Sequence, residues 1–234
     1  MNVTILKFPG TNCDRDVAAA LERVPGVRRE IVWHTQFKRS STDLLVLPGG
    51  FSYSDRLRAG AIAARSPVMD VVRDLIDDGG LVLGICNGFQ ILVEAGILPG
   101  ALLPNLSTRF ICRWVCLRVE NSRTPFTNLF SEGQLISMPI AHNEGRYVSG
   151  GSLRELRSKR RIIFTYVGAD GKRGEDANPN GSDGAVAGIS NDDYNVLGLM
   201  PHPERASDPL LSPYGTEHGH TLFLSIANYV RGRA

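Results

Sequence analysis

The chain has 234 residues, 42% of them hydrophobic, with 26 Lys and Arg against 24 Asp and Glu. Its length fits one large α/β domain with a substantial core, predicted to span residues 1–234. A formal net charge of +2 argues against a nucleic-acid-binding surface. The four cysteines lack the spacing of a disulfide framework, and no apolar run reaches the roughly 18 residues of a membrane span. We therefore expect a cytoplasmic protein with neither a nucleic-acid nor a membrane partner.

The first half of the chain alternates apolar strands with helical patterns, which predicts a doubly wound, mostly parallel sheet of the flavodoxin-like kind. Strands are expected at residues 2–8, 27–34, 42–47 and 81–85. The helices between them are expected to begin at a Thr11 or Asn12 cap, at Pro67 and at Asn87. The helix from Asn87 should end at Gly96.

The second half is richer in strands and is expected to extend or flank that sheet. Its strands are predicted at residues 109–120, 134–141, 161–167, 185–190 and 195–200, before a last helix with one apolar face. Residues 157–161 predict a solvated helix end and turn, with a docking patch as the alternative. Residues 168–184 predict a long surface loop, too polar to bury, with partner contact or a substrate lid as its functional alternatives.

The sequence Gly84-Ile-Cys86-Asn-Gly88 directly follows the apolar run at residues 81–83. Gly-x-Cys-x-Gly is the strand-to-helix nucleophile elbow with cysteine in place of serine, because the glycines permit a tight, strained turn that exposes one side chain. A lone cysteine is more often structural, but these flanking glycines favour a nucleophile. The helix that Asn87 opens would stabilise a thiolate at its N-terminus.

A cysteine nucleophile requires a base, and His202 is the candidate. It lies between Pro201 and Pro203, and a residue before proline is restricted to extended backbone. Because residues i and i+2 of an extended segment point the same way, Glu204 should reach the imidazole and fix its tautomer. In the first half of the chain, the apolar run at residues 44–47 is followed by a glycine turn that contains Gly50. The N–H groups of Gly50 and Asn87 are predicted to bind an oxyanion.

These pieces together resemble the class I glutamine amidotransferases, which use a Cys-His-Glu triad. The surrounding sequence is similar to the glutaminase subunits of phosphoribosylformylglycinamidine synthase, from the Pro9-Gly-Thr-Asn-Cys-Asp turn to the last helix. The most specific motifs are Phe51-Ser-Tyr and Cys86-Asn-Gly-Phe-Gln90, supported by Ala141-His-Asn-Glu-Gly145 and Met200-Pro-His-Pro-Glu-Arg205. Ser54, Ala59 and Asn143 depart from the expected pattern, at positions that carry no proposed catalytic group.

The resemblance implies that Cys86, His202 and Glu204 release ammonia from glutamine, that Gly50 and Asn87 bind the oxyanion, and that Gln90 helps to hold the substrate. It implies a large synthetase subunit, which uses ATP and magnesium to convert phosphoribosylformylglycinamide, and a small accessory subunit. No metal or cofactor is expected in this chain, which lacks a Walker-type phosphate loop. The alternatives are an amidotransferase subunit for another acceptor and a non-catalytic regulatory protein on the same fold.

Overall fold

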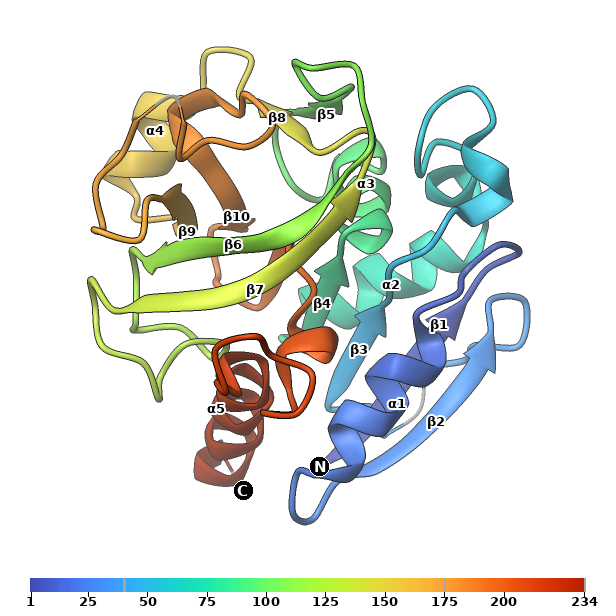
Figure 1. Ribbon diagram of the computed structural model, residues 1–234. Coiled ribbons are helices and arrows are strands. Elements are labelled where there is room, and N and C mark those ends of the chain that lie inside the picture. The colour runs from blue at the N-terminus through green and yellow to red at the C-terminus, as the bar shows by residue number, and fades with distance from the viewer. Residues whose placement is uncertain (40, 175, 234) are drawn as a thin grey trace.

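The computed structural model describes residues 1–39, 41–174 and 176–233 (Figure 1). The first half contains β1 (Asn2–Lys7), α1 (Asp14–Glu22), β2 (Arg28–Trp33), β3 (Leu44–Leu47), α2 (Val68–Asp77), β4 (Leu81–Ile85), α3 (Asn87–Glu94) and β5 (Ala101–Leu103). The second half contains β6 (Ile111–Val119), β7 (Leu135–His142), β8 (Arg146–Val148), α4 (Leu153–Ser158), β9 (Ile162–Val167), β10 (Val186–Ser190), β11 (Val196–Leu199) and α5 (His218–Arg233). None of the helices in these ranges is long and apolar enough to cross a membrane.

One nine-stranded sheet, in the order β2-β1-β3-β4-β11-β10-β9-β6-β7, runs through the molecule. In this spatial order, the five strands from β2 to β11 pair in parallel, and the four strands from β10 to β7 are added by antiparallel pairing. The order β2-β1-β3-β4 followed by a fifth parallel strand is that of a flavodoxin-like sheet. The predicted fold class is therefore confirmed. The strand-rich second half extends the same sheet, except for β8, which pairs with β5 in a separate two-stranded antiparallel sheet.

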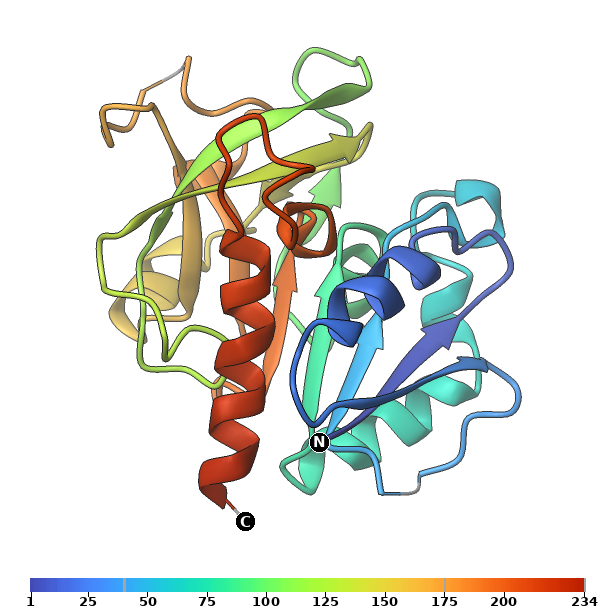
Figure 2. The same ribbon diagram turned by 60° about the horizontal axis from the view of Figure 1, so that its bottom comes forward.

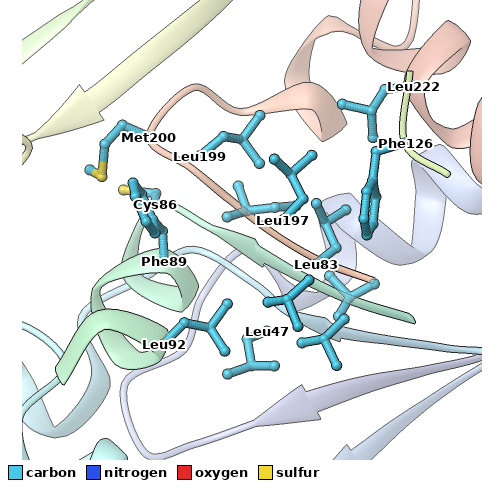
Figure 3. Close-up of a cluster of buried hydrophobic side chains, with 14 of the residues drawn as sticks. Leu47, Leu83, Cys86, Phe89, Leu92, Phe126, Leu197, Leu199, Met200 and Leu222 are labelled. Atoms are coloured by element: carbon cyan, nitrogen blue, oxygen red, sulfur yellow. The ribbon is translucent and has the colours of Figure 1, made fainter. Parts of the chain in front are cut away.

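Helices cover both faces of the parallel half of the sheet. Figure 2 shows α1 and α5 in front of the strands and α2 behind them, while α3 packs against β3, β4 and β11. The strands between these layers are buried on both faces: every residue of β3, β4 and β11 is buried, which explains their continuous apolar sequences. Figure 3 shows Cys86 at the edge of this core, beside Phe89 and Met200.

Glycines allow α3 to approach the strands more closely than any other residue would. A Cβ atom at Gly88 would overlap the carbonyl oxygen of Leu47 in β3, and one at Gly198 would overlap the ring of Phe89. A Cβ atom at Gly84 would lie 2.5 Å from Leu92 Cδ1. Side chains at these three positions would push α3 away from the sheet, so the glycines fix where the helix begins.

The helix cap expected at Thr11 or Asn12 is wrong. Cys13 precedes α1 and makes no side-chain cap hydrogen bond. The Thr11 hydroxyl instead accepts a hydrogen bond from the N–H of Phe8 at 3.1 Å, which closes the turn after β1. Thr11 also forms an isolated antiparallel bridge with Gly50, so the turn is tied to the neighbouring strand end and is not available for capping.

The two polar stretches are more buried than their sequences indicate. Residue 175 lies outside the described residues, but Asn180 and Ser182, at 0% and 3% exposure, contradict the expectation that the whole loop is too polar to bury. Asn180 Nδ2 donates to the carbonyl of Gly145 at 2.8 Å, and the Ser182 hydroxyl donates to Asn180 Oδ1 at 2.7 Å.

The helix end at residues 157–161 is confirmed, but Arg161 is buried and donates to the Ser190 carbonyl. These hydrogen bonds offset the free-energy cost of removing the polar side chains from water.

Because a Cβ at position 88 would overlap backbone, we predict that Gly88→Ala lowers the free energy of unfolding by about 1–3 kcal/mol or more. The matched control is Gly232→Ala in α5, where an added Cβ meets nothing within 4 Å and the change should stay below about 1 kcal/mol. Urea unfolding curves of both variants provide the measurement. Equal effects would show that α3 has room to retreat from β3.

Candidate active site

Three adjacent strands deliver the predicted catalytic groups to one edge of the sheet. β3 leads into Gly49 and Gly50, β4 leads into Cys86, and β11 leads through Met200 and Pro201 to His202. Parallel strands share their carboxyl ends, and ligands of open α/β sheets bind at that edge. Residues that lie far apart in the chain are therefore brought together where the sequence pattern places a site.

Cys86 forms the strained elbow that its flanking glycines predict. Its backbone has φ 50° and ψ −103°, a conformation that residues with side chains rarely adopt. The Cys86 N–H donates to the carbonyl of Leu199 in β11 at 2.8 Å, and the sulfur lies 3.7 Å from the Ala141 carbonyl. Only 5% of the residue is exposed, so the thiol faces a cavity rather than open solvent.

His202 and Glu204 form a buried pair, with Nδ1 and Oε1 2.6 Å apart. The contact is as expected, but its geometric reason differs: His202 is extended, with φ −104° and ψ 92°, whereas Glu204 lies in the short 3₁₀ helix Pro203–Ala206. Burial opposes a charged imidazole. The negative charges of Glu204 and Cys86 outweigh burial and raise the pKa of His202 well above its usual value. His202 Nε2 has no hydrogen-bond partner among the described residues.

The structure adds Cys13 and Arg205, which the sequence interpretation did not assign. Cys13 is buried in the turn after β1, and Arg205 Nη2 lies 3.1 Å from its sulfur. The ligand-capable atoms of Cys13, His202 and Glu204 lie within 4.8 Å of one another. These donor types suit a soft metal ion, but the Arg205 guanidinium beside the sulfur repels a cation. The arrangement fits a second sulfur that packs against the imidazole better than it fits a metal ligand.

The two predicted oxyanion donors are free to bind a ligand. Neither the N–H of Gly50 nor that of Asn87 donates a hydrogen bond to another group in the ranges that the structure describes. The Asn87 side chain is occupied, because Oδ1 accepts from the Ser52 N–H at 3.1 Å and Nδ2 donates to Gln90 Oε1 at 2.9 Å. Gln90 Nε2 donates to the Glu144 carbonyl at 2.7 Å. Gln90 therefore also fixes the backbone opposite the elbow.

A cavity of about 130 Å³ lies at this site; its lining includes Gly50, Cys86, Gln90 and His142, with Asp55 and Glu144. Burial, together with the neighbouring charge of Glu144, raises the pKa of Asp55 to about 6. Burial and the charge of His202 lower the pKa of His142 to about 4, so this imidazole is neutral at pH 7. His142 is thus a poor alternative to His202 as a base.

The charge of Glu204 raises the pKa of His202, so we predict that Glu204→Gln lowers it. The amide retains a hydrogen-bonding oxygen and removes only the charge. An NMR titration of the imidazole nitrogens should show the His202 midpoint at lower pH in this variant and unchanged in Glu155→Gln, an exposed carboxylate of α4. An unshifted midpoint in Glu204→Gln would mean that other groups hold the proton on His202.

Comparison with known proteins agrees with this geometry. A family model for the CobB/CobQ-like glutamine amidotransferase domain matches residues 1–230. Phosphoribosylformylglycinamidine synthase subunit PurQ of Moorella thermoacetica is 51% identical over 230 residues, covering 98% of this chain and 96% of that one. The PurQ of Pyrobaculum aerophilum is 52% identical, covering 99% and 100%. A solved structure of PurLQS from Thermotoga maritima has a TM-score of 0.86 at 44% identity, covering 98% of both chains. The chain therefore belongs to the PurQ family of glutamine amidotransferases.

Proposed function

We propose that this chain is the glutaminase subunit of phosphoribosylformylglycinamidine synthase, which supplies ammonia for purine biosynthesis. The observation that carries the proposal is the placement of Cys86 beside the buried pair of His202 and Glu204, at the carboxyl ends of the adjacent strands β4 and β11. Full-length similarity at about half identity supports this subunit type over an amidotransferase for another acceptor. The whole of residues 1–234 would form one amidotransferase domain.

The proposed reaction is acyl transfer through a thioester. The Cys86 sulfur attacks the side-chain amide carbon of glutamine, and the N–H groups of Gly50 and Asn87 stabilise the oxygen as it gains negative charge. The C–N bond breaks as His202 gives its proton to the leaving nitrogen, which departs as ammonia. His202 then takes a proton from water, and the resulting hydroxide cleaves the thioester to glutamate and free Cys86. Glu204 keeps the imidazole oriented throughout.

Ammonia release is half of the overall synthesis, and the acceptor chemistry belongs to partner subunits. We place the ATP and magnesium requirement in a large synthetase subunit that activates the amide oxygen of phosphoribosylformylglycinamide. A small accessory subunit completes the complex. Ammonia must reach the large synthetase subunit without dilution, so a direct passage between the Cys86 site and the synthetase site is part of the proposal. A cytoplasmic complex is consistent with the free cysteines of this chain.

We predict that Cys86→Ala lowers glutamine-dependent synthesis by the assembled complex roughly a thousandfold or more, because it removes the sulfur that forms the thioester. Synthesis with added ammonia should persist, since the large subunit retains its own site. Cys112→Ala, on the exposed part of β6, is the matched control and should keep both activities. A glutamine-derived electrophile should label Cys86, as detected by mass spectrometry. Labelling of Cys13 in its place would reassign the nucleophile.

The isolated chain should hydrolyse glutamine slowly, because unrestrained glutaminase activity would waste glutamine. We predict that binding to a substrate- and ATP-loaded synthetase raises kcat at least about tenfold. Such a change needs only about 1.4 kcal/mol of preference for the competent state. Glutamate release per Cys86 at saturating glutamine measures it. Equal turnover by the isolated chain and the loaded complex would refute this coupling.

A further inference from the structure

The catalytic cavity contains two carboxylates that the proposed mechanism does not use. Asp55, from the loop after β3, and Glu144, from the turn after β7, line the same cavity as Cys86. They interact electrostatically, since the charge of Glu144 contributes to the raised pKa of Asp55. Two carboxylates at one partly buried site repel each other and stabilise neither the fold nor an anionic intermediate.

No cation within the described residues forms an ion pair with either carboxylate; the charge of Glu144 contributes to the raised pKa of Arg58, but only from a distance. The Arg58 guanidinium is bound in two places by Glu94, with Nε–Oε1 at 2.6 Å and Nη2–Oε2 at 2.7 Å. Glu144 uses one oxygen, Oε2, to accept the Ala59 N–H at 3.1 Å. Its other oxygen and one from Asp55 remain available to a ligand that carries positive charge.

His142 is a third acceptor in the lining of this cavity. Asn105 Nδ2 donates to the carbonyls of Arg109 and His142, which makes Oδ1 the oxygen that faces His142 Nδ1 at 3.0 Å. Nδ1 must therefore carry the proton, and Nε2 carries a lone pair. This nitrogen belongs to a side chain that is 3% exposed, and it has no partner among the described residues. The cavity thus combines two carboxylates with an unpartnered acceptor and calls for a ligand rich in donors.

We infer that Asp55 and Glu144 bind the α-ammonium group of glutamine and thereby select an α-amino acid as substrate. This inference rests on the proposed glutaminase function. With the side-chain amide at Cys86, the ammonium group lies only a few bonds away at the other end of the substrate, and both carboxylates line the same small cavity as Cys86. Hydrogen bonds between an ammonium group and carboxylates are charge-assisted, so they favour glutamine over an amide that lacks the amino group.

The test compares glutamine with 4-carbamoylbutanoate, which is glutamine without its amino group. The assembled complex is assayed for glutamate and for glutarate, with wild-type protein, Asp55→Asn, Glu144→Gln and the control Asp193→Asn, an exposed carboxylate outside the cavity. In both cavity variants the preference for glutamine, as a ratio of kcat/KM values, should fall at least about tenfold. The analogue's own kcat/KM should change less than about twofold, and Asp193→Asn should match the wild type.

Equilibrium binding gives the same comparison without turnover. In Cys86→Ala protein, calorimetry should show tighter binding of glutamine than of the analogue, and Asp55→Asn in that background should remove most of the difference. An unchanged preference in the variants, or an equal loss for both substrates, would overturn the inference; equal loss would indicate a role for the pair in ammonia release. If the wild-type loaded complex releases no glutamate at all, the proposed function fails instead.

The same inference has a pH signature. A proton on Asp55 competes with the ammonium group, so KM for glutamine should rise as pH falls through about 6. The other titratable or charged groups around Asp55 are Glu144, His142 and Cys86 in the cavity, and Tyr53, Arg56 and Arg58 in its own loop. Asp55→Asn removes the competing proton and should flatten the rise, whereas titration of the other groups would leave it. A KM profile that is identical in the two proteins counts against the inference.

Discussion

The position of the proposed nucleophile depends on a backbone conformation that Cys86 would not adopt by itself. Holding a residue with a side chain at φ 50° and ψ −103° costs on the order of 1–3 kcal/mol. Two constraints maintain it: the close packing of α3 at Gly88 against Leu47, and the hydrogen bond from the Cys86 N–H to Leu199. Leu199 ends β11, the strand that leads to His202. One strand therefore fixes both the sulfur and the imidazole, and their relative position does not rely on a flexible loop.

The features that could be predicted from sequence are those with a local signal. The elbow is encoded by glycines two residues on either side of Cys86, and the buried strands are encoded by continuous apolar runs. The pairing of His202 with Glu204 was predicted from proline spacing, yet the structure reaches it through a 3₁₀ helix. The two residues are only two positions apart, so their side chains cannot be far from each other. The predicted contact is therefore correct although the predicted extended conformation of Glu204 is wrong.

The missed features depend on contacts between distant segments. Cys13 is brought to His202 because β1 ends at the same edge of the sheet as β11, and Arg205 lies 192 positions away from Cys13 in the chain. Tyr53, Ser54 and Asp55 all have positive φ, between 51° and 59°, although none is glycine. No propensity predicts such a run. Tertiary contacts impose it, including the hydrogen bond from the Ser52 N–H to Asn87. Sequence patterns identify the nucleophile and base more readily than the residues that bind the rest of the substrate.

This strained loop also connects the outer surface with the chemistry. Leu57 is 92% exposed and Phe51 is 44% exposed, and both belong to the segment that carries Asp55 and touches the elbow through Ser52 and Asn87. Exposed apolar side chains beside a catalytic cavity are suited to burial by another protein. A subunit that covers Leu57 would restrict the loop, and with it the Asn87 peptide that we propose as an oxyanion donor. A small interface preference could therefore change the competence of the site without moving the core that holds Cys86 and His202.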